Sequence, residues 1–286
     1  MPSSGASSTP AAVATGSAKR WGQLLIGILC MSMIANLQYG WTLFVNPIHD
    51  KFLWTRAEIQ VAFTIFVLTE PWLVPIEGYL VDRFGPRPVT LAGGLMVGIS
   101  WVLNAHADSL MLLYISAAIG GTGAGAVYGT CVGNALKWFP DHRGLAAGLT
   151  AAGFGAGSAL TIIPIANMIA SNGYQATFLT FGLFQGIVVF IASWFLSAPK
   201  LGEVPLSKLV AQVTRNFNPM EVLRQPVFWV MFVVMTSVGV GGQMATAQLG
   251  PIATDWGVDK TPVSFFGITL CNAMIVLSPV QCAGMM

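Results

Sequence analysis

Two acidic residues interrupt an otherwise apolar stretch, and they are the strongest candidates for chemistry in the chain. Glu70 and Glu77 lie between residues 58 and 81, with Pro71 and Pro75 between them. An ionised carboxylate inside a bilayer must face protein, water or a partner charge, or else take up a proton. Both acids are therefore candidates for a proton-sensitive role. Glu77 lies near the end of the stretch, where it can pair with a loop arginine, so a structural role is the preferred interpretation there. Glu70, nearer mid-stretch, is the better candidate for a proton-sensitive or gating role; a structural role for Glu70 is the alternative.

A second set of polar side chains offers hydrogen bonds in place of charge. Gln38 and Tyr39 lie in the first apolar stretch, next to Asn36 and Trp41, and Tyr128 lies in a later one. Amide and phenol groups can donate hydrogen bonds to an anionic solute. The alternative is an aromatic belt at the membrane surface, which fits Trp41 better than Gln38.

Residue types that enzymes and metal sites use are scattered through the chain. The three histidines fall in loops on both sides of the expected membrane, and the four cysteines form no CxxC pair. The run GGTGAGA at 120–126 is rich in glycine like a phosphate-binding loop, but it lies inside an apolar segment with no preceding strand. We therefore predict no catalytic residue, no metal and no cofactor.

The composition indicates that these residues are positioned by membrane-spanning helices. Of 286 residues, 55% are hydrophobic and 8% are charged, whereas soluble domains contain about 25% charged residues. The net charge of +2 is too small for a nucleic-acid-binding protein. We predict an all-α polytopic bundle that requires lipid. Its eight expected helices are 21–46, 58–81, 88–106, 109–136, 143–169, 175–198, 226–250 and 261–284.

Basic residues predict the orientation of this bundle. If the loops alternate between the two sides, one side carries Lys19, Arg20, Arg83, Arg87, Lys137, Arg143, Lys200, Lys208, Arg215 and Arg224, and the other carries Lys51, Arg56 and Lys260. Loops rich in Lys and Arg remain in the cytoplasm. We therefore expect a multi-pass protein of the cell inner (plasma) membrane, with its N-terminus and the 199–225 linker cytoplasmic.

The chain divides into four parts by composition. We expect a disordered tail at 1–18, a six-helix transmembrane domain at 19–198, a linker at 199–225, and the first two helices of an incomplete second domain at 226–286. Within the linker, the sequence Asn218-Pro219-Met220-Glu221 predicts a short helix on the membrane surface, with a plain linker as the alternative.

Glycine spacing predicts close helix packing. The fourth expected helix has Gly121, Gly125 and Gly129 at four-residue intervals, and the fifth has Gly153 and Gly157. Residues four apart share one helix face, and small residues there let two backbones approach closely. We expect these two helices to form a tightly packed pair that slides during function; static packing is the alternative.

Residues 78–87 read GYLVDRFGPR and resemble the signature between helices 2 and 3 of the major facilitator superfamily. The matching residues are Gly78, Asp82, Arg83, Gly85 and Arg87. The resemblance implies that Asp82 and Arg83 belong to a gating charge network with the opposite half of a transporter. Gly78 is expected to allow a close helix crossing there.

A narrower resemblance is to the oxalate/formate antiporter family and its monocarboxylate-transporter relatives. It rests on QYGWTLF (38–44), FVLTEPWLVPIEGYLVDRFGPR (66–87) and KWFPDHRGLAAGLTAAGFGAG (137–157). By this resemblance, Gln38, Tyr39 and Tyr128 line a dicarboxylate site. The cations that the family places in helices 8 and 11 are missing, since no Lys or Arg follows Lys260. Ala117 stands where proton-coupled members have an arginine, which weakens a proton-symport interpretation.

The resemblance implies transport of small organic anions, mono- or dicarboxylates, by alternating access in a monomer without nucleic-acid partners. Such a transporter needs two six-helix halves around a central site, so we expect the 286-residue chain to come from a truncated gene model. Two alternatives are a facilitator for another solute, such as a sugar, drug or nitrate, and a membrane remnant that transports nothing.

Overall fold

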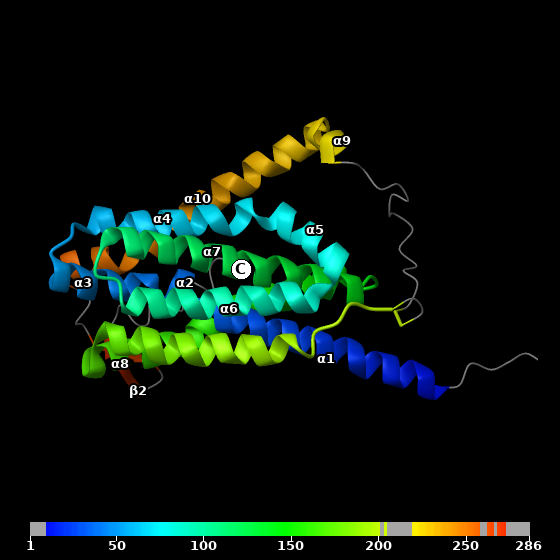
Figure 1. Ribbon diagram of the computed structural model, residues 1–286, viewed down its shortest axis with the longest axis horizontal. Helices are drawn as coiled ribbons and strands as arrows, with labels where there is room; N and C mark the ends of the chain where they lie inside the picture. The colour runs from blue at the N-terminus through cyan, green and yellow to red at the C-terminus, as the bar shows by residue number, and fades with distance from the viewer. Residues whose placement is uncertain (1–9, 201–202, 205–218, 258–261, 266–267, 273–286) are drawn as a thin grey trace, which may run out of the picture.

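The protein is an elongated bundle of helices (Figure 1), seen in a computed structural model that describes residues 10–200, 203–204, 219–257, 262–265 and 268–272. The helices are α1 (Pro10–Ile34), α2 (Asn36–Tyr39), α3 (Trp41–Phe52), α4 (Arg56–Trp72), α5 (Val74–Phe84), α6 (Pro86–Ala105), α7 (Leu110–Trp138), α8 (Arg143–Ser193), α9 (Pro219–Leu223) and α10 (Pro226–Asp255). The helical bundle predicted from hydropathy is confirmed.

Within the described residues, four helical stretches are long and apolar enough to cross a bilayer. They are 18–52, 86–105, 110–138 and 143–193, and the bent pair α4 and α5 makes a fifth. The last stretch, α8, has 51 residues, which at about 1.5 Å per residue is more than twice the roughly 30 Å of a bilayer core. It must therefore cross twice.

The chain reverses direction inside α8 at Gly173. This residue has φ 82° and ψ 164°, a conformation that residues with a Cβ rarely adopt. The indole of Trp138, just before α8, donates a 2.7 Å hydrogen bond to the carbonyl of Ser197, just after it. Both ends of α8 thus lie at the same end of the bundle, and its two arms correspond to the predicted helices 143–169 and 175–198.

The first two spans are interrupted in their middle. The first breaks at Ala35 and Gly40, which leaves α2 as one short turn between α1 and α3. The second bends by 45° between α4 and α5. The bend lies at Leu73, between Pro71 and Pro75, because each proline removes a backbone donor and crowds the preceding turn. These breaks position the candidate site described below.

A buried aromatic cluster packs the spans together. The rings of Phe44 and Phe178 stack with centroids 3.9 Å apart, and Trp101 meets Phe178 edge-on at 5.2 Å. The three side chains come from α3, α8 and α6, so one cluster joins three elements. At one end of the bundle, Arg56 makes a 2.7 Å ion pair with Asp255, and this pair joins the end of α10 to the start of α4.

The N-terminal prediction is wrong for part of the tail. Residues 10–18, expected to be disordered, belong to helix α1. Proline at the first helical position and several alanines favour a helix there, a local propensity that the low-complexity composition concealed. Residues 1–9 lie outside the described residues. The short helix predicted from 218–221 is present as α9 over its described residues, and its place on the membrane surface stays a prediction.

The eighth predicted helix is wrong where the structure describes it. Strands β1 (Pro262–Phe265) and β2 (Ile268–Asn272) pair antiparallel, with Val263 opposite Leu270. Val263, Ile268 and Thr269 are β-branched and favour extended backbone, and high hydropathy alone does not separate a buried strand from a helix. Residues 273–284 of that predicted helix lie outside the described residues.

Charged residues gather at the end of the bundle where α1 enters, which we call the basic end. Arg20 pairs there with the carboxylate of Asp141 and donates a 2.8 Å hydrogen bond to the carbonyl of Trp138. Partial burial by itself opposes ionisation of Asp141. The hydrogen bonds from Arg20 and His142 and the charge of Arg20 outweigh that burial, so the pKa of Asp141 lies below its ordinary value.

Folding lowers the pKa of Asp141, so the Arg20–Asp141 pair stabilises the folded protein. This stabilisation is complete at pH values above the ordinary pKa of the carboxyl group, and it is lost as the pH falls through the lowered pKa. We expect Arg20→Met to lower thermal stability at neutral pH by roughly 1–3 kcal/mol and to reduce the acid dependence of unfolding. Lys19→Met, which removes the more exposed Lys19–Glu203 pair, is the control and should have a smaller effect. Equal melting curves for Arg20→Met and wild type would contradict a stabilising role for the Arg20–Asp141 pair.

Candidate functional site

A cleft of about 710 Å³ opens between α2, α4, α7 and α8. The polar side chains in its wall are Gln38, Tyr39, Glu70 and Tyr128. The structure therefore brings together all three residues that the resemblance assigned to substrate binding, and it adds one of the two candidate acids.

The break between α1 and α3 places Gln38 and Tyr39 in this wall. Both lie on the single turn α2, and the helix resumes after Gly40. A Cβ at Gly40 would lie 2.7 Å from the carbonyl oxygen of Asn36, so only glycine fits this tight turn. Trp41, which an interfacial belt would expose, is instead buried and donates to Gln60 at 3.3 Å. The belt interpretation is therefore wrong for Trp41.

An aromatic side chain that sequence reasoning missed joins the two tyrosines. The ring of Phe154, on α8, lies edge-on to Tyr39 at 5.3 Å and to Tyr128 at 5.6 Å. It forms part of the cleft wall between their phenol groups. A phenylalanine inside a long apolar stretch carries no signal of its own, so only the spatial arrangement reveals it.

Glu70 occupies the last turn of α4, at the edge of the bend. Its backbone carbonyl is held directly against Gly125 of α7, where a Cβ would collide with the carbonyl oxygen. This contact fixes the acid at the cleft wall. None of the described residues that line the cleft is Lys or Arg, so the hydrogen-bond donors there are the amide and phenol groups.

The expected pairing of Glu77 with an arginine is wrong. The Glu77 side chain is buried, and both of its carboxylate oxygens lack a hydrogen-bond partner among the described residues. Arg83 instead donates to the hydroxyl of Tyr79 at 3.1 Å, one turn away on the same helix. Glu77 faces inward while Arg83 lies on the exposed side of α5, so the two side chains do not meet.

The 78–87 signature forms the turn from α5 to α6 at the basic end. Asp82 makes a 2.8 Å ion pair with Lys137 of α7, whereas the resemblance implied a network with the opposite half. Gly85 has φ 87° and allows the reversal between the two helices, and Arg87 is exposed. A Cβ at Gly78 would meet no described atom within 4 Å, so the described helices make no close crossing at Gly78.

The two glycine rows do not face one another. Gly121 and Gly125 pack directly against the backbone of α4, and a Cβ added at Gly129 would lie 3.8 Å from Cγ1 of Val74 at the start of α5. Gly153 and Gly157 pack directly against α1. The predicted glycine-to-glycine pair is thus wrong, because each row is filled by the backbone of a different partner helix. Close packing by these glycines is nevertheless present.

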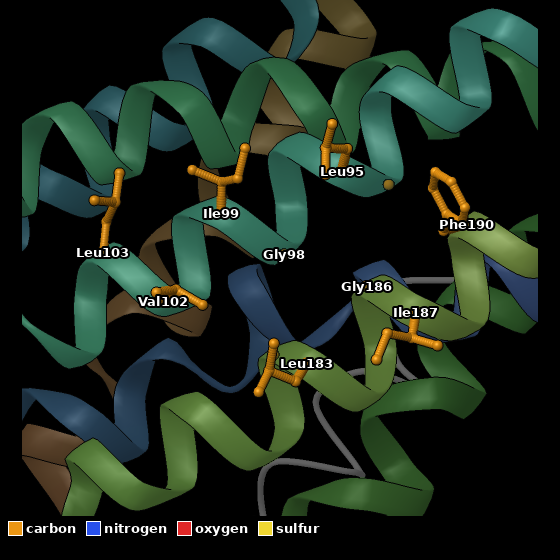
Figure 2. A pocket seen from close by; sticks show the side chains of 11 residues that line it. Leu95, Gly98, Ile99, Val102, Leu103, Leu183, Gly186, Ile187 and Phe190 are labelled. Atoms are coloured by element: carbon orange, nitrogen blue, oxygen red, sulfur yellow. The ribbon is translucent and has the colours of Figure 1, made fainter.

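A second cavity, of about 430 Å³, lies between α6 and the second arm of α8 (Figure 2). Only glycines and apolar side chains line it, including Leu95, Ile99, Leu183 and Ile187, all of which are exposed. This groove offers no donor or acceptor side chain to a polar solute. Such a surface suits lipid, and the polar cleft between α2 and α7 remains the candidate site.

The sequence is similar to several transporters. It is 37% identical to the oxalate:formate antiporter of Oxalobacter formigenes over 88% of this chain and 60% of that protein. It is 25% identical to the probable sulfoacetate transporter SauU of Cupriavidus necator over 62% of this chain and 42% of that protein. It is 26% identical to monocarboxylate transporter 11 of Mus musculus over 64% of this chain and 41% of that protein.

The chain thus spans between 41% and 60% of the length of these three relatives. Residues 24–285 match the Major Facilitator Superfamily. That match covers most of the chain and includes the described spans, apart from the first residues of span 18–52, as well as the 78–87 signature. The chain is therefore a multi-pass membrane protein that belongs to the major facilitator superfamily.

Proposed function

We propose that the protein carries small organic anions, mono- or dicarboxylates, across the plasma membrane by alternating access, with its N-terminus and the 199–225 linker in the cytoplasm. The observation that carries this proposal is the cleft that gathers Gln38, Tyr39 and Tyr128. The similarity to the oxalate:formate antiporter supports the class of solute. Exchange of one anion for another is the reaction that this similarity favours.

The cleft suits a small carboxylate for physical reasons. The Gln38 amide and the two phenol hydroxyls can donate hydrogen bonds to carboxylate oxygens, and bonds to a charged acceptor are stronger than neutral ones. Phe154 covers one side of the cleft, which limits competition from water. The backbone break at α2 places Gln38 and Tyr39 in the cleft wall, and interrupted helices form the solute sites of many transporters.

Gln38→Ala and Tyr39→Phe are each expected to weaken anion binding about tenfold, since each removes one hydrogen-bond donor worth roughly 1.5 kcal/mol to a charged acceptor. The measurement is exchange of radiolabelled oxalate and formate in proteoliposomes as a function of concentration. Tyr114→Phe is the matched control, because its hydroxyl donates to the carbonyl of Glu58 away from the cleft. Unchanged affinity and rate in both variants would remove Gln38 and Tyr39 from the site.

A neutral solute such as a sugar is a second candidate, and Glu70 is the observation that favours it. Its carboxylate lines the cleft, and no cation accompanies it among the described lining residues. A panel of anions, sugars and drugs tested for competition with labelled oxalate separates the two candidates. Competition by sugars alone would replace the proposed anion with a neutral solute. No flux of any solute would leave a membrane protein that does not transport.

A further inference from the structure

Helix α5 contacts the bundle through an acid. Of its 11 residues, Glu77 is the buried one, with 7% of its surface exposed. Apolar side chains of α5, including Val74, Ile76 and Phe84, are exposed, although Phe84 also lines the cavity beside Glu77. A spanning helix usually places its polar atoms toward a partner, so the chemistry at this buried acid bears on how α5 packs against the bundle, beside the exposed Asp82–Lys137 pair at its end.

The surroundings of Glu77 offer no partner for a charge. A cavity of about 280 Å³ lies beside it between α5, α6 and α7, lined mainly by apolar residues such as Val89, Met96 and Ala126. Thr122 supplies the other side-chain oxygen in this lining, and its hydroxyl already donates to the carbonyl of Ala118 at 2.8 Å. Both oxygens of Glu77 lack a hydrogen-bond partner among the described residues.

The charged groups on neighbouring helices do not compensate Glu77. Arg87, the charged residue of α6, is exposed, and Lys137, the charged residue of α7, pairs with Asp82. Neither lines the cavity. The acid on α4, Glu70, supplies no positive charge either. An ionised Glu77 would thus be buried without a compensating charge, whereas the neutral acid is tolerated.

A metal cation does not fit the same position. Hard cations such as Na⁺ and Ca²⁺ need several oxygen ligands at once. The described lining supplies the two oxygens of Glu77 and one committed hydroxyl. A proton needs one carboxylate oxygen, so it is the ligand that this site can accommodate.

We propose that Glu77 is a proton-binding site that controls the docking of α5: the carboxylate takes a proton from water and holds α5 against α6 and α7 as the neutral acid, and loss of that proton releases the helix. The bend at Leu73 supplies a hinge for this motion. Because α5 also carries Asp82 and leads into the turn at Gly85, its release would move the 78–87 signature. The coupling to transport rests on the proposed function.

Proton binding can be tested without transport. In the purified protein in lipid nanodiscs, infrared spectra should show the C=O band of a protonated carboxylic acid at neutral pH. Glu77→Gln should lose that band, and Glu77→Asp should keep a shifted one. Glu203→Gln is the control, since Glu203 pairs with Lys19 outside the spans, and it should leave the band unchanged. A spectrum in which Glu77→Gln retains the full band would overturn the proposal.

The release of α5 is tested with a fluorescent label on Phe84→Cys, because Phe84 lies exposed at the end of this helix. The label signal should titrate with pH in the otherwise wild-type protein and lose its pH dependence with Glu77→Gln, which mimics the neutral acid. The same titration in both backgrounds would refute control of docking by Glu77. If wild type transports no anion, the proposed function fails, whereas the infrared and label measurements still decide the role of Glu77.

Discussion

Replacing Gly157 with valine is expected to prevent normal packing of the first and fifth spans. Gly157 is buried on α8, where a Cβ would collide with the carbonyl oxygen and Cα of Ser32 on α1. The colliding atoms are backbone, so no side-chain rotation relieves the contact. Overpacking of this kind costs about 1–3 kcal/mol or more, and the helices can avoid it only by separating.

Separation of α1 and α8 would also break a hydrogen bond between them. The hydroxyl of Ser32 donates to the carbonyl of Gly153 at 2.8 Å, which requires the close approach that the two glycines permit. The space beside Gly153 is filled by Ile28, whose Cγ2 would lie 2.8 Å from an added Cβ. We expect Gly157→Val to show a large drop in monodisperse protein and in melting temperature in detergent.

Gly148→Val is the matched control for this prediction. Gly148 lies on the same helix, is exposed, and has no described atom within 4 Å of an added Cβ. Both substitutions bring the same change in helix propensity, so a difference between them isolates the contact with α1. Equal melting temperatures for the two variants would show that the close approach at Gly157 contributes little to stability.

The outcome at the glycines illustrates what the sequence can and cannot predict. Four-residue spacing correctly indicated that Gly121, Gly125, Gly153 and Gly157 lie at close helix contacts. It could not indicate the partner, because periodicity reports which face of a helix is small and not which helix fills it. The pairing of α7 with α4, and of α8 with α1, depends on the three-dimensional order of the spans.

Hydropathy was sufficient for the first six spans, since a bilayer requires long apolar helices whatever their packing, but it failed at 261–284, where the described residues form strands. The turn at Gly173 falls between two predicted helices, 143–169 and 175–198. The internal breaks were less visible. Pro71 and Pro75 mark the bend of the second span, whereas the interruption around α2 has only Gly40 as a local signal, and an isolated glycine is tolerated in most helices.

The candidate site was predictable in part. Gln38, Tyr39 and Tyr128 came from resemblance, and the fold places them in one cleft. Glu77 was expected to pair with a loop arginine because it lies near the end of its span, but Arg83, six residues further on, does not share its helix face. The direction in which an acid points depends on how α5 docks, which local sequence does not determine.

Reversing the charge of Asp82 is expected to slow transport far more than it weakens solute binding. Asp82 and Lys137 join the ends of α5 and α7 at 2.8 Å, and Asp82→Lys would set two ammonium groups against each other there. The pair is exposed, with 73% of the Asp82 side chain accessible, so its effect on folding stability is about 1 kcal/mol or less. A bias between transport states is therefore the larger consequence.

A coupling of about 1–3 kcal/mol corresponds to a change of roughly 5- to 150-fold, and we expect the exchange rate of Asp82→Lys to fall within this range. Asp82→Asn should fall less, because it removes attraction without adding repulsion. The combined variant Asp82→Lys with Lys137→Asp restores the pair in reverse and should recover most of the rate. Solute affinity, measured by equilibrium binding, should stay near wild type throughout. A switch between transport states acts on turnover and depends on the charge pair as a unit. Equal losses of affinity and rate, or no recovery in the combined variant, would therefore show that Asp82 only maintains local structure.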